Sequence, residues 1–528
     1  MPNEVLTPFM RCVLTMAFLV SAALWAAEPT RPASAVAASI PLTLSSAVDR
    51  ALLNNLGLAV TRLSAFNALD SIDSAQSIFD PTFSWTNTLS GLRTPTEIAA
   101  GTLAERSYLS SVGLGQKFSW GGTLSVSAGV TRAWGESGDL GTPSYYSFGT
   151  TVAYTQPLLS GGWQVANLTA LISARQGALR GRLTLRAATL DLIRDTEISY
   201  WSLSGARTLV ALRETSLRSS ESLLAQVKAK RALGDATLLE ELQAAADVSS
   251  QRVAVLNAHQ SVDSAEMSLR RTLGRGNVVD DIEKSLVVSE LPADVIAAPD
   301  AFQPWLRTAA AFDFDTAIQL TNLATADAVV DQARQNDQPS LNLTVGGSSY
   351  GDPALGFSGG YDALRHQAGW SNSASLVLSF PLGFRGSEAT LRSATRARRQ
   401  AELQLADVRQ TLVFNARAAW RDLEAARARV TASAATLDLQ RKSYEGERAR
   451  YAAGQSSILL VLQSQAALDS AQVSWLQALL DARVASARVA RLDGTILPRH
   501  GFKMEALEQK VGAGIGPADP LPPLTDSQ

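Results

Sequence analysis

The sequence repeats itself at a distance of 220 residues, and this internal duplication limits the possible folds more than any other feature. The stretch RALGDATLLEELQAAADVSS, residues 231–250, aligns with YAAGQSSILLVLQSQAALDS, residues 451–470. The identical pairs are Ala232/Ala452, Gly234/Gly454, Leu239/Leu459, Leu242/Leu462, Gln243/Gln463, Ala246/Ala466 and Ser250/Ser470. A repeat of this length predicts two copies of one supersecondary plan within a single chain.

Two segments without proline predict very long helices. They run from about Trp163 to Ala232 and from Ser387 to Ala452. Apolar residues in the first segment recur at a spacing of three and four, which is the period of an α-helix. About 70 residues at 1.5 Å each would reach roughly 100 Å, which is too long for a helix within an ordinary globule. We therefore expect a coiled coil or a barrel of helices.

Shorter segments alternate polar and apolar residues with the period of a β-strand. Four of them lie between Pro81 and Pro157, and two lie within residues 340–381. Each is about as long as a strand of a transmembrane barrel, with aromatic residues near its ends. The segment WGGT, residues 120–123, predicts a hairpin between two of these strands. A soluble β-sandwich is the alternative, but the long helices beside the strands argue against it.

The N-terminus and the composition indicate an exported protein. Residues 1–27 have the pattern of a signal peptide, with an apolar run that ends in small residues at Ala26 and Ala27, and the exact cleavage site stays open. The formal net charge of −2 gives no electrostatic argument for binding nucleic acid. The chain has one cysteine, Cys12, and three histidines, so we expect no disulfide, no metal centre and no cofactor.

Each half of the chain follows the same order: a helix, strands, a proline with glycines, a very long helix, a glycine turn and a second helix. The repeated segments on either side of each glycine turn set the predicted boundaries. The predicted division is a first repeat over residues 42–274 (strands 81–157, turn near 234), a linker over 275–312, a second repeat over 313–494 (strands 340–381, turn near 454) and a flexible tail over 495–528.

These features together resemble the outer membrane efflux protein family typified by TolC. The resemblance rests on the signal peptide, the doubled plan, the segment TQPLLSGG that leaves a strand, and the pattern G-x5-[EL]-x-L-Q that opens the second arm of each hairpin. It covers roughly residues 42–494. It implies a mainly α-helical, internally duplicated protein with transmembrane β-strands, in which a long antiparallel α-helical barrel continues into a trimeric outer-membrane β-barrel.

The resemblance also implies a function. Such a protein is a passive exit duct in the outer membrane of a Gram-negative bacterium, within a tripartite efflux or type I secretion system, and it is not an enzyme. It works as a homotrimer with a periplasmic adaptor, an inner-membrane pump and outer-membrane lipid, without nucleic acid. The sequence leaves open the exported substrate and whether the pump is of the RND, ABC or MFS class.

Two candidate sites follow from the resemblance. The hairpin turns would lie at the periplasmic end of the tunnel, where a gate closes it, and the candidates there are Gly234, Glu240, Glu241, Tyr451, Gly454, Ser456, Leu460 and Gln463. The candidates for the junction between barrel and helices are Pro157, Gly161, Gly162, Pro381 and Gly386. Proline ends a strand because it cannot donate to the ladder, and glycine then lets the chain turn into a helix.

Two features depart from the family pattern. The first half contains four strand candidates where the family has two, so each chain contributes four or six strands; we expect the extra pair to form a hairpin at or above the membrane. The second tip has Leu460 and Gln463 where the family often has acids. The aperture would then depend on a ring of Glu240 and on Tyr451. The alternative for Glu240 is a solvated residue that the helix dipole favours.

Other interpretations stay open. One is a structural periplasmic coiled-coil protein without channel activity. Another is an exported hydrolase that uses Ser358 of the GFSGG motif near His366, although an outer loop is the favoured interpretation of this segment.

The Arg-rich residues 394–400 are expected to form a solvated helix face, with lipopolysaccharide contact as the alternative. Trp85, Trp120, Trp134 and Trp370 are candidates for an interfacial girdle, and Trp201, Trp420 and Trp475 for packing between helices.

Overall fold

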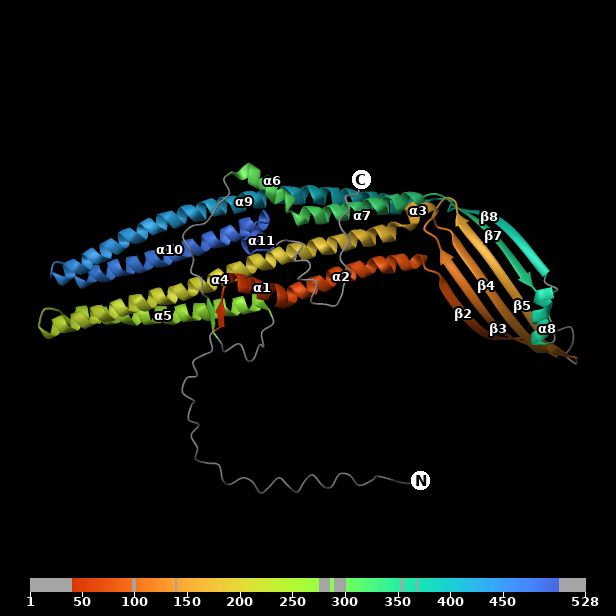
Figure 1. The fold of residues 1–528 in the computed structure, drawn as a ribbon, viewed down its shortest axis with the longest axis horizontal. Helices are drawn as coiled ribbons and strands as arrows, with labels where there is room; N and C mark the ends of the chain where they lie inside the picture. Colours follow the sequence, from red (N-terminus) through yellow and green to blue (C-terminus); the bar gives the residue numbers. More distant parts are fainter. Residues whose placement is uncertain are drawn as a thin grey trace, which may run out of the picture.

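The molecule is long, with helices at one end and a β-sheet at the other (Figure 1). Two helical hairpins reach away from the sheet, and shorter helices pack along them between the hairpins and the sheet (Figure 1). The signal peptide expected at residues 1–27 lies outside the described residues. The computed structural model describes residues 40–96, 101–137, 140–274, 285–288, 301–351, 353, 356–366 and 369–502.

The first half of the chain begins with a short strand and ends with a long helical hairpin. Its elements are β1 (Ile40–Leu42), α1 (Leu44–Asn54), α2 (Leu56–Gln76), the short 3-10 helix η1 (Ser77–Phe79), β2 (Thr82–Thr96), β3 (Gly101–Lys117), β4 (Thr123–Ser137), β5 (Leu140–Pro157), α3 (Trp163–Asn167), α4 (Thr169–Ala232) and α5 (Leu238–Leu273). The long helix predicted from Trp163 is interrupted once, at Leu168. The 64 residues of α4 alone reach roughly 96 Å.

The second half repeats this order with fewer strands. Its elements are β6 (Leu286–Val288), α6 (Phe302–Ala311), α7 (Phe314–Asn336), β7 (Ser340–Tyr350), α8 (Phe357–His366), β8 (Gly369–Ser379), α9 (Arg385–Ala452), α10 (Ile458–Leu492) and α11 (Ile496–Arg499). β6 pairs in parallel with β1, which ties the segment between the halves to the first strand. None of the described helices has both the length and the apolar character that crossing a membrane requires.

Six strands form one antiparallel sheet, in the order β2-β3-β4-β5-β7-β8. β3 and β4 pair with β2 and β5 along almost their whole length, so they are part of the middle of the sheet. The expectation that the extra strands form a hairpin at or above the membrane is therefore wrong. Backbone pairing with the neighbouring strands holds them in the sheet, and their alternation continues the faces of those strands. The predicted WGGT turn is confirmed, with Gly121 at φ +91° and the Phe118 N–H donating to the Gly122 carbonyl at 2.8 Å.

The register gives the sheet one apolar face and one polar face. Directly opposed residues share a face, so a row of side chains can be followed from strand to strand. One row on the apolar face is Phe83, Leu114, Val126 and Val152. The neighbouring row on the other face is Ser84, Gly113, Ser127 and Thr151. A transmembrane barrel strand alternates in this way, with apolar side chains toward lipid and polar side chains toward the lumen.

Buried aromatic clusters hold the middle of the helical part. Trp305 and Trp420 lie with ring centroids 5.5 Å apart, and the Trp305 indole N–H donates to Asp493 at 2.9 Å. Tyr200 and Trp201 form a second cluster beside α5 and β1. Trp201 and Trp420 are thus packing residues, as predicted, whereas Trp475 is only half-buried.

The chain after α10 differs from the expected flexible tail over its first residues. Residues 495–502 belong to the fold, because α11 brings Ile496 and Leu497 into a buried cluster with Leu190 and Ile193 of α4. The prediction of a tail is wrong for this part. Apolar side chains directly after the hairpin find an apolar surface on the neighbouring helix, and their burial favours an ordered turn. Residues from 503 onward lie outside the described part of the chain.

The GFSGG segment is also ordered differently from the outer loop expected there. Phe357 begins helix α8, which packs against β5 at the end of the sheet away from the hairpins (Figure 1). The Phe357 ring lies 5.1 Å from that of Phe148 and 5.9 Å from that of Tyr146. These aromatic contacts fix the segment as a helix. Ser358 and His366 lie at opposite ends of it.

Candidate gate and barrel junction

Both helical hairpins turn through the same backbone structure. A glycine in the left-handed region follows each long helix, Gly234 at φ +85° and Gly454 at φ +74°. Each turn closes with two backbone hydrogen bonds in the Schellman pattern. The bonds are Asp235 N–H to Lys230 C=O at 2.9 Å, Gly234 N–H to Arg231 C=O at 3.0 Å, Gln455 N–H to Arg450 C=O at 2.9 Å and Gly454 N–H to Tyr451 C=O at 3.1 Å.

The two tips differ in how the return helix begins. At the first tip, Thr237 and Glu240 form a capping box, in which each side chain accepts from the backbone N–H of the other residue. At the second tip, Ser457 occupies the cap position and makes no side-chain hydrogen bond there. The residue that corresponds to Glu240 is Leu460, which cannot accept a hydrogen bond and is exposed. The second turn therefore lacks the cap that stabilises the first.

The acidic candidates of the first tip are engaged within their own turn. The Glu240 carboxylate accepts from the Thr237 backbone N–H at 2.7 Å and from its hydroxyl at 3.1 Å. Glu241 forms an ion pair with Arg231 across the turn. The alternative interpretation, in which Glu240 stabilises the start of its helix, thus has direct geometric support. A ring of Glu240 carboxylates at the aperture stays a prediction.

The candidates of the second tip point in different directions. Ser456 donates its hydroxyl to Glu447 on α9, so it ties the turn to the preceding helix. Gln463 and Leu460 are exposed on the return helix. Tyr451 is only 6% exposed, and it packs in a cluster from both hairpins that includes Val227. In one chain, this tyrosine therefore belongs to the contact between the hairpins.

Lys230 completes this contact. Its ammonium lies 4.1 Å from the centroid of the Tyr451 ring and donates to the Tyr451 carbonyl at 3.2 Å. Burial raises the pKa of the Tyr451 hydroxyl, and the negative charge of Glu240 raises it further. The tyrosine therefore stays neutral at physiological pH and acts as an apolar ring with a cation on its face. A lysine on one hairpin and a tyrosine on the other thus join the two tips.

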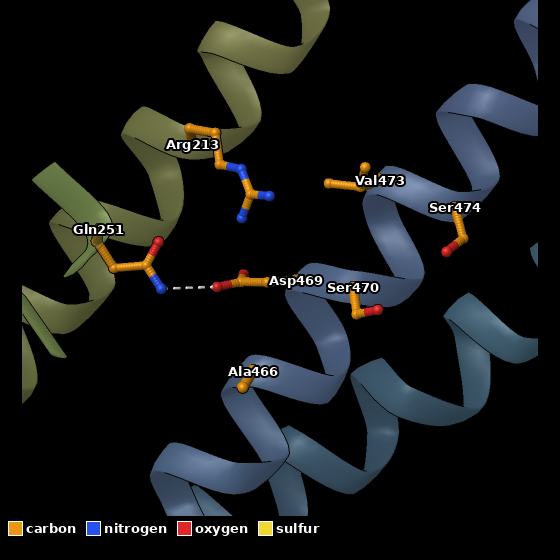
Figure 2. A pocket seen from close by; sticks show the side chains of 7 residues that line it. All are labelled: Arg213, Gln251, Ala466, Asp469, Ser470, Val473 and Ser474. Carbon is orange, nitrogen blue, oxygen red and sulfur yellow. Dashed lines mark hydrogen bonds between the residues drawn. The ribbon is translucent and has the colours of Figure 1, made fainter. Parts of the chain in front are cut away.

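A buried polar network joins the hairpins farther from the tips. Asp469 of α10 accepts from the Ser216 hydroxyl at 2.6 Å. It also accepts from the Gln251 amide at 3.0 Å (Figure 2). Gln465, one turn earlier, donates to the Ser220 hydroxyl, which donates to Asp247. Helices α4, α5 and α10 all contribute, so the network crosses the seam between the first and the second hairpin. We refer to these six residues as the seam network.

A small cavity opens beside Asp469. It has a volume of about 320 Å³ and is lined by Arg213, Gln251, Ala466, Asp469, Ser470, Val473 and Ser474 (Figure 2). Burial raises the pKa of the Asp469 carboxyl, while hydrogen bonds from Ser216 and Gln251 and the charge of Arg213 act in the opposite direction. Burial is the largest of these influences. The carboxyl group is therefore easier to protonate than an exposed aspartate.

Sequence reasoning did not find the seam network. Its signal is the pair Gln465 and Asp469, which lie one helical turn apart among small and apolar residues on the buried face of α10. Polar residues at the buried positions of a helix need partners, because an unpaired polar group inside a protein is costly. Such a pattern indicates a polar contact to another helix. It does not indicate which helix supplies the partners.

At the first junction between sheet and helices, the predicted residues act together. Pro157 ends β5, and the Leu158 and Ser160 N–H groups donate to carbonyls of the β7 side. Gly161 has φ +74°, and a Cβ on Gly162 would lie 2.6 Å from the Pro157 carbonyl oxygen. Both glycines are therefore required by the backbone.

The second junction uses a different residue. Pro381 follows the end of β8, but the left-handed residue is Phe384, at φ +44°. Gly386 lies inside the first turn of α9, with open space where a Cβ would be. The expectation that Gly386 makes the turn is therefore wrong. The Phe384 ring stacks on that of Phe380 at 6.0 Å, and this packing accompanies the strained backbone.

Comparison with known proteins shows which family has this sequence pattern. The sequence model of the family described as outer membrane efflux protein matches residues 96–275 and 305–495, which is most of the chain. Among characterised relatives, the chain is similar to the outer membrane efflux protein BepC of Brucella suis biovar 1 (strain 1330). The two are 25% identical over 371 residues, which cover 69% of this chain and 74% of the relative.

Solved structures of outer-membrane channels have the same fold. The CmeC outer membrane channel of Campylobacter jejuni aligns with a TM-score of 0.66 and 17% identity, over 89% of this chain and 88% of that chain. The open state of the MtrE outer membrane channel of Neisseria gonorrhoeae aligns with a TM-score of 0.60 and 18% identity, over 85% and 88%. The fold is that of channel proteins rather than of enzymes. The chain belongs to the outer membrane efflux protein family, as a TolC-like channel protein of the outer membrane with a large helical part in the periplasm.

Proposed function

We propose that the protein is the outer-membrane exit duct of a tripartite export system and that it works as a homotrimer. The observation that carries this proposal is the open six-stranded sheet at the end of two long helical hairpins. Among the described strands, β2 and β8 each have a neighbour on one side only. Their free backbone N–H and C=O groups need partners in lipid, and further copies of the chain supply them.

The two edges of the chain are suited to meet each other. β2 lies on the same edge as α2 and α5, whereas β8 lies on the edge of α9 (Figure 1). The helices on both edges carry large exposed apolar side chains. On α5 these include Leu242 and Leu256, and on α9 they include Phe414 and Leu439. Unlike edges that join head to tail close into a ring when the rotation fits.

The width of the six-stranded sheet and the width of the four long helices fit the same ring. Six strands about 4.8 Å apart, tilted by about 40°, span an arc of roughly 38 Å. The helices α5, α4, α10 and α9 lie side by side in this order, and four helices span roughly 32–40 Å. Three copies would then form an eighteen-stranded barrel over a ring of twelve helices. Barrels of about 16–18 strands leave an aqueous channel.

The tips support a role for a periplasmic adaptor and an inner-membrane pump. At the first tip, Leu233, Leu238, Leu239 and Leu242 are all exposed, and Leu233 is 79% exposed. An apolar surface of this kind at the end of a hairpin is suited to bind a partner. In this proposal the pump supplies the energy, the adaptor moves the hairpin arms, and the duct supplies a continuous aqueous path.

Single-channel recording in planar lipid bilayers tests the proposal. The purified wild-type protein should give small conductance steps, because Tyr451 and Lys230 hold the hairpin tips together. Tyr451→Ala should give larger steps, since the seam loses both the ring and the cation contact. Thr436→Ala, at an exposed position on the same helix whose hydroxyl donates to a carbonyl of that helix, is the matched control and should leave the steps unchanged. Absence of conductance in both the wild type and Tyr451→Ala would support the structural coiled-coil alternative.

A further inference from the structure

Two arginines interrupt the apolar face of the sheet near the end that lies away from the helices. They are Arg106 of β3 and Arg132 of β4, and both are exposed. The register places them in consecutive rows that also contain aromatic residues. The inner row is Leu89, Tyr108, Arg132 and Tyr146, and the next row outward is Gly91, Arg106 and Trp134.

Two aromatic rings flank the Arg132 side chain. The Arg132 guanidinium lies 5.1 Å from the centroid of the Trp134 ring and 5.7 Å from that of Tyr146. The Tyr108 hydroxyl donates to Asn87 at 2.8 Å. Among the described side chains, no carboxylate forms an ion pair with either arginine. The Arg132 guanidinium group is therefore held between two aromatic rings.

The depth of the arginines along the strands corresponds to the outer boundary of the hydrocarbon layer. The opposite end of the apolar face is marked by Trp120, which stacks on Phe118 and donates to the Tyr154 hydroxyl at 2.9 Å. Arg132 comes eight residues after Leu124, in the row of Tyr154. Eight residues at about 3.3 Å, with a tilt of about 35–45°, rise roughly 19–22 Å.

Arg106 lies one row farther out. Its strand runs ten residues from Gln116, which lies in the row of Leu124 and Tyr154. By the same estimate it lies roughly 23–27 Å from that row, and the apolar band of such barrels is about 25 Å tall. Apart from Arg132, the rows in between contain no charged residue on this face. Arg132 therefore lies just inside the outer edge of the apolar band, and Arg106 lies close to that edge. At this depth an arginine on the lipid side destabilises the barrel only slightly, and its side chain can reach the headgroups.

We propose that Arg106 and Arg132 bind the phosphate groups of the glycolipid that forms the outer leaflet. A guanidinium group matches the geometry of a phosphate with two parallel N–H···O bonds. The aromatic rings beside it occupy the interfacial layer, which is the usual place of tyrosine and tryptophan. The proposal rests on the location in the outer membrane and on the faces of the sheet, and it does not depend on the export function.

Helix α8 extends this interfacial surface. It packs on the outer part of β5, where Phe357 contacts Tyr146, the same ring that lies beside Arg132. Phe357 and Tyr361 remain more than half exposed, and the last turn carries Arg365 and His366. An amphipathic helix with aromatic residues and a basic end is suited to the interface of a membrane. It would enclose the lipid headgroup from the side of β5.

The Arg-rich segment of α9 is a weaker candidate for the same ligand. Arg398 pairs with Asp327 of α7, and Glu402 lies 2.8 Å from Arg398 and 2.7 Å from Arg399. The guanidinium groups of Arg398 and Arg399 are therefore already engaged in ion pairs with these carboxylates. The segment also lies on the helical side of the sheet, away from the outer leaflet (Figure 1). The lipopolysaccharide contact considered for it from sequence is therefore better assigned to Arg106 and Arg132.

The test measures binding of lipid A to the purified full-length protein in phosphatidylcholine nanodiscs. We compare bis-phosphorylated lipid A with the same lipid after phosphatase treatment. Each of Arg106→Gln and Arg132→Gln should weaken binding of the phosphorylated lipid about fivefold, and the double variant roughly 25-fold. The dephosphorylated lipid should bind to the wild type with the same affinity as it binds to the double variant. Equal binding of both lipids to the wild type would overturn the proposal.

A charge-preserving control separates the effect of the arginine's position from that of the overall charge. The double variant R106S/S107R moves the cation to the neighbouring residue on the polar face, so the net charge and composition are unchanged. It should lose the same affinity as Arg106→Gln. Retained affinity would show that overall charge, rather than position, attracts the lipid. Inorganic phosphate should compete only at large excess; equal binding of free phosphate would assign the site to a soluble anion instead.

Bilayer conductance separates this proposal from the proposed function. Arg106→Gln and Arg132→Gln should conduct as the wild type does, because both residues lie on the lipid side of the sheet. Loss of lipid A binding with normal conductance supports the proposal alone. Normal lipid A binding in the double variant would contradict it even if the channel conducts.

Discussion

Asp469 links the contact between the hairpins to pH. Burial raises the pKa of its carboxyl group above the ordinary value of 3.8, although two hydrogen bonds act against the rise. The folded protein therefore binds the proton more tightly than the unfolded chain does. The stabilisation is complete below the ordinary pKa, and it is lost as the pH rises through the raised pKa of the folded protein. The seam between the hairpins should thus weaken toward neutral pH.

Replacing the hydrogen-bond donor tests this linkage. Ser216→Ala should lower the free energy of unfolding by about 1–3 kcal/mol, because the buried carboxylate loses a donor. The loss should be larger at about pH 8 than at about pH 5, where more of the carboxyl is protonated. Denaturant unfolding of the purified protein measures both values. Ser249→Ala, an exposed serine on α5, is the control, and equal losses at the two pH values would contradict the linkage.

The tip glycines should be sensitive to any side chain. Gly234→Ala and Gly454→Ala should each destabilise the protein by roughly 1–2 kcal/mol, because a Cβ is strained at a positive φ. Gly446→Ala is the matched control, since Gly446 lies within α9 with open space around it. That change should stabilise the helix by roughly 0.5–1 kcal/mol. Thermal unfolding measures the difference; the same sign for Gly234→Ala and Gly446→Ala would count against the strained turn.

At the scale of residues, the sequence predicted where a side chain lies along its helix better than it predicted which other side chains it contacts. Glu240 was correctly placed at the start of a helix, but its carboxylate caps that helix, and whether it also faces the aperture is untested. Tyr451 lies buried between the hairpins of one chain, and its expected place at the aperture stays a prediction. Asp469 was not found at all. The packing of one hairpin on the other decides these roles, and no local pattern in the sequence encodes it.

At the scale of elements, the helices and strands follow directly from local patterns. The Pro-free segments became α4 and α9, and the alternating segments became β2 to β5, β7 and β8. The place of β3 and β4 did not follow, because alternation fixes the face of a strand and not its neighbours. Residues 495–502 were misjudged for a similar reason. Ile496 and Leu497, which follow the last long helix, look like part of a tail until a neighbouring helix covers them.

The capping difference between the two return helices gives a prediction with its control in the same chain. Thr237→Ala should destabilise the start of α5 by about 0.5–2 kcal/mol, because the capping box is lost. Ser457→Ala should change the start of α10 by a few tenths of a kcal/mol, since that hydroxyl makes no cap bond. Hydrogen exchange of the first turn of each helix measures both. Equal effects at the two tips would contradict the structural difference.

At the scale of the whole molecule, the described sheet is open at both edges. β2 and β8 each have one neighbour among the described strands, and the helices on both edges carry exposed apolar residues. Six strands with the pattern of a membrane barrel cannot enclose a wide lumen alone. The number of strands in each chain required the structure. Closure with two further copies is the central claim of the proposed function.

Crosslinking between the two edge strands tests this claim most directly. Ser84 of β2 and Val377 of β8 each lie two residues from the helical end of their strand, on the polar face. The only native cysteine, Cys12, lies in the predicted signal peptide, so the variant S84C/V377C carries a unique reactive pair. A short bis-maleimide should link chains of the variant in membranes into a ladder that ends at three, and neither single variant should crosslink. No intermolecular product, or a ladder that continues beyond three chains, would contradict the trimeric duct.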